Sequence, residues 1–149
     1  MEKAKKQLKT SSLFVLLFAG LSLMNIISAL TFGDINSATI PEGAPDNILQ
    51  ITKVIILTLT AIILLPKVYV GIKGLQIAKN PVASKRHITV AMLILAFEAF
   101  GAIDPVLGIV KEGFTMEHFT TLADVVLEVC IIYEYIKYAK EVAKLAEQD

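Results

Sequence analysis

The stretch "SSLFVLLFAGLSLMNIISALTF", residues 11–32, decides the class of fold, because it contains no charged side chain. A helix of about 20 apolar residues is long enough to cross the hydrocarbon core of a bilayer. The sequence therefore predicts a first membrane span at about 11–32. A secretory signal peptide is the alternative, since four lysines precede the stretch. The apolar core of a signal peptide is shorter, however, usually about 7–15 residues.

The overall composition also favours a bilayer environment. Hydrophobic residues make up 55% of the 149 residues and charged residues 19%, against about 25% charged residues in soluble proteins. The length suits a single domain. The formal net charge is zero, so we expect no nucleic-acid partner. The single cysteine, Cys130, excludes an internal disulfide and is interpreted as a small apolar filler.

Three further spans are predicted at about 48–72, 88–110 and 119–139. The segment 119–139 is the least apolar, because it holds three acidic residues and a lysine. A charge at the centre of a membrane helix costs roughly 2.5–3.5 kcal/mol. This helix is therefore expected either to turn its acids toward the other spans or to lie on the membrane surface. Both interpretations stay open.

The connections between the spans are recognised by residues that break helices. Residues 33–47 contain two prolines and two glycines and show no helical periodicity. In the second connection, 79–87, Pro81 is expected to end the preceding helix and Ser84 to cap the next one. Gly113 is the expected break in the third connection.

The placement of lysines predicts how the chain is oriented in the membrane. Lysines gather before the first span, in the second connection and at the end of the fourth span, whereas the first connection has none. Because positive residues favour the cytoplasmic side, both termini should be cytoplasmic. The sequence thus predicts one all-α domain over 1–149, a polytopic four-helix bundle of the cell membrane with a short helical tail at 140–149.

Polar residues inside the predicted spans are the candidate functional residues, because burying them in a membrane is costly. They are Glu98, Glu128, Asp124, Asp104, Lys53, Lys67 and Asn25. Counting at about 1.5 Å per residue places Lys53 at the outer depth of Asp104 and Asp124. The same count places Lys67 near the inner end, at the depth of Glu134.

Glu98 and Glu128 are expected near mid-membrane, with no cation at their level. A carboxyl group there can take up a proton or hydrogen-bond across helices, for example to Asn25. The first possibility predicts a site for a proton, a cation or a cationic solute. The second predicts that these side chains only stabilise helix–helix packing. Both interpretations stay open.

A basic cluster at the inner interface consists of Lys85, Arg86 and His87. Such a cluster can hold a lipid phosphate or an acidic partner. The alternative is that it only sets the orientation of the chain.

Catalytic, metal-binding and nucleotide-binding motifs are not found, so no cofactor, no metal and no enzyme activity are expected. An enzyme acting on lipid or quinone is kept as a minor alternative. The stretch "GIKGLQIAKNPVASKRH", residues 71–87, resembles a loop of small, uncharacterised four-span membrane proteins of Gram-positive bacteria, and covers about a tenth of the chain. That resemblance carries no assigned chemistry. Small multidrug transporters also have four spans and a membrane glutamate, but theirs lies in the first span.

Two functions are therefore weighed. The first is a non-catalytic accessory or regulatory subunit that binds another membrane protein within the lipid bilayer. The second is a small proton- or cation-coupled transporter or channel, which would require a homo-oligomer because four helices enclose little space. In the second function the mid-membrane carboxylates would bind the transported species.

Overall fold

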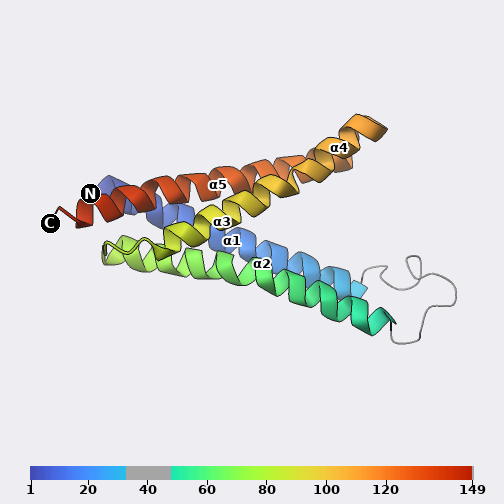
Figure 1. The fold of residues 1–149 in the computed structure, drawn as a ribbon, viewed down its shortest axis with the longest axis horizontal. Helices are drawn as coiled ribbons and strands as arrows, with labels where there is room; N and C mark the ends of the chain where they lie inside the picture. The colour runs from blue at the N-terminus through green and yellow to red at the C-terminus, as the bar shows by residue number, and fades with distance from the viewer. Residues whose placement is uncertain (33–47, 149) are drawn as a thin grey trace.

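The computed structural model describes residues 1–32 and 48–148, and within these residues the chain is all helical. The predicted all-α class is thus confirmed. Figure 1 shows the helices in chain order: α1 (Glu2–Phe32), α2 (Ile48–Lys79), α3 (Arg86–Gly101), α4 (Ile103–Glu112) and α5 (Met116–Ala146). The predicted first connection, 33–47, lies outside the described residues.

The helices are longer than the apolar segments that predicted them. α1 begins at Glu2 rather than near residue 11, and α2 continues to Lys79 rather than ending near Ile72. α5 continues to Ala146, so residues 140–146 of the predicted tail are helical. Lysine, glutamine and glutamate are good helix formers. The helices therefore extend past their apolar residues. The spans predicted from hydropathy were too short, because they covered only the apolar part of each helix.

The connection between α2 and α3 is only partly as predicted. α2 ends at Lys79, two residues before Pro81, because a proline disfavours helical geometry in the residue that precedes it. α3 begins at Arg86, and its N-cap is Lys85, whose side chain makes no capping hydrogen bond. The predicted cap at Ser84 is therefore wrong.

The predicted third span is two helices rather than one. α3 ends at Gly101, α4 begins at Ile103, and Ala102 stands between them. Proline has no N–H and its ring collides with the carbonyl group four residues earlier. For the buried Pro105 that carbonyl belongs to Gly101, so the helix breaks at this place. Together the two helices still form one long apolar segment.

The helices form two groups, α1 with α2 and α5 with α3 and α4, and these groups separate toward one end of the molecule. Both chain ends lie at the same end, and from there the α1–α2 pair diverges from the pair formed by α5 with α3 and α4 (Figure 1). Among the described residues, α4 contacts α3 and α5 but neither α1 nor α2. We call the half with the chain ends the terminal half. The other half is the distal half. The boundary between the two halves lies at the level of Lys67 in α2, Glu98 in α3 and Glu128 in α5.

The core occupies the terminal half, where all the long helices meet. Its buried residues are Ala4, Leu8, Val15, Val70, Ile77, Ile88, Ala91, Ile94, Ile132, Tyr135, Ile136, Ala139, Val142 and Ala143. The α1–α2 contact depends on small residues, because a Cβ atom on Gly74 would collide with Ser12 and Tyr135. Close approach of backbones at small residues is the usual way in which membrane helices pack.

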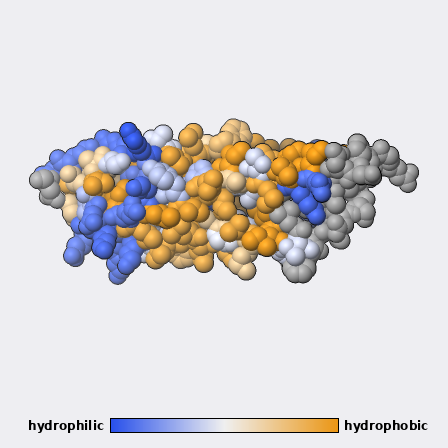
Figure 2. All heavy atoms as spheres, turned by 90° about the horizontal axis from the view of Figure 1, so that it is seen from below, coloured by the Kyte–Doolittle hydropathy of each residue, from blue (hydrophilic) through white to orange (hydrophobic). Residues whose placement is uncertain are grey.

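Three helical segments are long and apolar enough to cross a membrane: Glu2–Ser28, Gln50–Lys79 and Arg86–Glu112. The last of them combines α3 and α4. Figure 2 shows hydrophilic residues gathered at the terminal end and hydrophobic residues covering the middle of the molecule. These features are compatible with a membrane location, because large apolar side chains on the outside suit a lipid solvent.

Candidate functional site

Three of the candidate residues meet at the boundary between the two halves. Nζ of Lys67 in α2 lies 2.6 Å from Oε1 of Glu98 in α3 and 2.6 Å from Oε2 of Glu128 in α5. Only 7% of the Lys67 side chain is exposed, with 15% of Glu98 and 14% of Glu128. We call these three residues the ionic triad. It joins three helices through two short charged contacts.

The lengths of the helices explain why these residues are level with one another. Lys67 lies twelve residues before Lys79, the last residue of α2, and Glu98 lies twelve residues after Arg86, the first residue of α3. Because the two helices are antiparallel and joined by a short connection, equal counts give equal depth, about 18 Å from the connection at 1.5 Å per residue. Glu128 is brought to the same level by α5.

The ionic triad corrects the predicted pairing of charges. Glu98 and Glu128 were expected to lack a cation at their level, and Lys67 was expected near Glu134. That expectation counted from Ile72, whereas α2 continues to Lys79, so Lys67 lies deeper than predicted. Glu134 instead lies on the surface, 3.6 Å from the Nζ atom of Lys137 on its own helix.

The surroundings of the triad make its charges depend on one another. Apolar side chains of α1 and α5, among them Val15, Phe18 and Ile132, border Lys67 and Glu128. An ion buried without its partner costs several kcal/mol even after relaxation. One ammonium group faces two carboxylates, so the fully ionised triad carries one surplus negative charge. A single proton or monovalent cation would make it neutral.

A second polar layer lies in the terminal half, between the triad and the chain ends. Oγ of Ser12 donates a hydrogen bond of 2.6 Å to the carbonyl oxygen of Leu8, and it lies beside Gly74. The rings of His87 and Tyr135 meet edge to face, with centroids 6.1 Å apart. Nε2 of His87 and the hydroxyl oxygen of Tyr135 are buried and make no hydrogen bond among the described residues.

The candidate residues of the distal half are not brought together. Asp104 and Asp124 are exposed, and neither they nor Lys53 form an ion pair with any described residue. Asp104 does not reach Lys53, because α2 and α4 do not touch in this part of the chain, and Asp124 in α5 forms no ion pair with Lys53 either. Asn25 is exposed on α1, which does not contact α3, so the predicted bond to Glu98 is not formed.

The predicted basic cluster is divided by the start of α3. Lys85 and Arg86 are exposed, but His87 is 1% exposed and belongs to the core. Nζ of Lys85 lies 2.9 Å from Oε1 of Glu147 near the end of α5. The connection between α2 and α3 is thus tied to the C-terminal helix.

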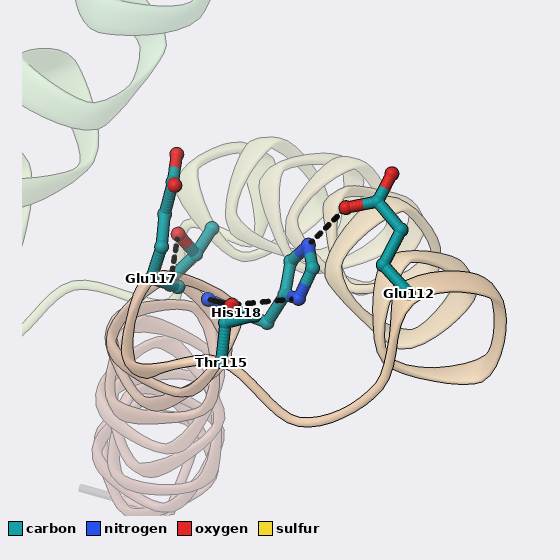
Figure 3. Close-up of polar contacts among 5 residues, drawn as sticks. Glu112, Thr115, Glu117 and His118 are labelled. Atoms are coloured by element: carbon teal, nitrogen blue, oxygen red, sulfur yellow. Dashed lines mark hydrogen bonds and ion pairs between the residues drawn. The ribbon is translucent and has the colours of Figure 1, made fainter.

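The turn between α4 and α5 carries a group of polar contacts at the distal end (Figure 3). Gly113 ends α4 with a φ of 86°, a conformation that glycine adopts without strain. Oγ1 of Thr115 accepts a hydrogen bond from the backbone N–H of His118 and lies 2.9 Å from its Nδ1 atom. Nε2 of His118 lies 3.9 Å from Oε2 of Glu112. These contacts hold α4 and α5 antiparallel.

Sequence reasoning identified all three members of the triad but not their association. It missed the buried Ser12–Tyr135–His87 layer, whose only signal is a serine in the polar start of an apolar helix. No cluster of metal-ligating side chains occurs in the described part of the chain. Comparison with known proteins found no matching family model, no matching curated protein and no matching solved structure.

Proposed function

We propose that this chain is an integral membrane protein with four spans, in which α5 is the fourth and both termini are cytoplasmic. The lysine-rich terminal end and the three apolar helices support this topology. α5 lies along α1, α3 and α4, and it turns Glu128 toward the ionic triad. Because Glu128, its central acid, is paired with Lys67, the free-energy cost of placing α5 in the hydrocarbon region is lower. The four spans then make up a bundle.

Within this topology the chain acts as a non-catalytic accessory subunit that binds a partner through its distal half. The observation that carries this proposal is the exposure of two carboxylates, Asp104 in α4 and Asp124 in α5, which in the proposed topology would face lipid. Asp124 lies four residues, about 6 Å, from Glu128, well inside the proposed span. An acidic residue that faces lipid is costly unless a neighbouring helix covers it.

The partner is expected to supply a positive charge. A transmembrane helix with a lysine or arginine at the depth of Asp104 and Asp124 would pair with both carboxylates. The α1–α2 pair diverges from α4 and α5 in this half (Figure 1), and α4 contacts only α3 and α5 among the described helices, so a helix that packs against α4 need not displace α1 or α2. The ionic triad would then hold the terminal half together as a scaffold.

Affinity purification of the tagged chain from native membranes in mild detergent tests this function. We expect a foreign membrane protein in fixed stoichiometry, identified by mass spectrometry, and we expect D124N and D104N to lose it. E117Q is the matched control, because Glu117 is an exposed acid in the first turn of the same helix. Retention of the partner by D124N and D104N would overturn the proposal.

A second candidate function is favoured by the surplus carboxylate of the ionic triad. In a homo-oligomer, Glu98 and Glu128 would exchange one proton or cation while Lys67 stays between them. Purification as a homo-oligomer without a foreign protein would favour this function. In proteoliposomes, E98Q or E128Q should then abolish proton or cation flux, whereas E134Q, a change at a half-exposed acid that lies in α5 like Glu128, should preserve it.

A further inference from the structure

A groove lies between α3 and α5 at the terminal end, and neither proposed function uses it. Its volume is about 470 Å³. α3 and its N-cap contribute Lys85, Ile88, Thr89 and Met92, and α5 and its C-cap contribute Lys140, Ala143, Lys144 and Glu147. The groove combines a positively charged end with an apolar floor.

The charges of the groove are unequal. Three lysines line it, and Glu147 is its one acid. Glu147 is already paired with Lys85, with 2.9 Å between the charged atoms. Lys140 and Lys144 are exposed, lie one helical turn apart on α5, and have no ion pair among the described residues. The groove therefore keeps about two uncompensated positive charges, which suit one anionic group.

The apolar floor of the groove indicates whether the ligand is a small anion or a lipid. Ile88 and Ala143 are buried in the core beneath it, and Met92 lies further along α3 with 43% of its surface exposed. From Lys85 to Met92 the wall thus changes from charged to apolar, in the direction of the membrane interior. A free phosphate ion would use only the lysines. A lipid would also place its glycerol and acyl carbons on the apolar floor.

We infer that this groove binds the phosphate group of an anionic phospholipid from the leaflet next to the chain ends. Basic grooves at the edge of a membrane span recognise anionic head groups in this way. The predicted basic cluster is thereby redrawn. Lys85 remains part of the basic site at the edge of the groove, whereas His87 is excluded because it is buried. Lys140 and Lys144, more than fifty positions further along the chain, supply the other positive charges of the site.

The test measures lipid that stays bound to the purified full-length protein. The protein is incorporated into nanodiscs of equal parts phosphatidylglycerol and phosphatidylcholine, released in mild detergent, and examined by native mass spectrometry. We expect phosphatidylglycerol to be retained in preference to phosphatidylcholine. In K140Q/K144Q, retention should fall about fivefold for each lysine removed. K140R/K144R, which keeps both positive charges, should retain the lipid, so that the loss in K140Q/K144Q is attributable to charge.

The matched control is K3Q/K6Q, which removes two exposed lysines from the same end of the molecule but outside the groove. If K3Q/K6Q loses as much lipid as K140Q/K144Q, the attraction is a general charge effect and the inference is wrong. It is also wrong if neither pair changes retention. Displacement of the bound lipid by inorganic phosphate would identify a free phosphate site instead. None of these results depends on a partner protein or on flux.

Discussion

Lys67 is the residue on which the arrangement of the helices depends most. Its ammonium group satisfies two carboxylates from two other helices at 2.6 Å each. Replacing a buried ion pair by apolar residues can be harmless, whereas removing one partner leaves a charge without compensation. In this triad the loss of the lysine would leave two acids facing one another. Loss of either acid would leave a simple neutral pair.

Replacement of Lys67 by methionine is therefore expected to destabilise the protein strongly. We expect the free energy of unfolding to fall by about 3–5 kcal/mol, measured by denaturant unfolding of the purified chain in detergent micelles. E98Q and E128Q should each cost less, because glutamine still accepts a hydrogen bond from Nζ. The control is K53M, a change on the same helix at a lysine that forms no ion pair with any described residue. Equal stability of K67M and K53M would contradict the structural role of the triad.

At the scale of the helix, the contact between α1 and α2 depends on where glycine allows the backbones to meet. Without a hydrophobic driving force between membrane helices, packing and interhelical hydrogen bonds supply the attraction. Gly74 is buried against Ser12 and Tyr135, whereas Gly20, on the neighbouring helix, has no atom within 4 Å of an added Cβ. Two glycines on neighbouring helices thus have different structural importance.

Alanine substitutions at these glycines are expected to act in opposite directions. G74A should lower the free energy of unfolding by about 1–3 kcal/mol, the usual cost of overpacking, because its Cβ collides with two buried side chains. G20A should leave stability unchanged or raise it by up to about 1 kcal/mol, since alanine is the better helix former. Thermal unfolding in micelles, followed by circular dichroism, compares the two variants. A tolerated G74A would mean that α1 and α2 do not meet as closely as described.

At the scale of the whole molecule, two pairs of helices meet in the terminal half and separate in the distal half. The core residues, the triad and the Ser12–Tyr135–His87 layer all lie in the terminal half or at its boundary. The distal half contains the exposed carboxylates Asp104 and Asp124. The molecule is thus well packed where its own helices meet. The two uncovered acids of its distal half lie where a partner is proposed to bind.

The proposed four-span topology is tested by labelling single cysteines in intact cells with a membrane-impermeant maleimide. On a C130S background, cysteine at Lys3 and at Gln148 should stay unlabelled, because both ends are proposed to be cytoplasmic. Cysteine at Phe114, in the turn between α4 and α5, should be labelled from outside. If α5 lay on the outer membrane surface instead of crossing, Phe114 and Gln148 would both be labelled.

The sequence by itself determined the helical class, the apolar segments and the identity of the polar residues within them, because each depends on local composition. Pro81 and Gly113 also ended their helices as predicted, since backbone restrictions act locally. What only the tertiary structure decided was which polar residues meet. Lys67 reaches Glu98 and Glu128 because α2 extends to Lys79 and the helices cross at that level. Such a meeting depends on helix ends and crossing positions, which hydropathy does not encode.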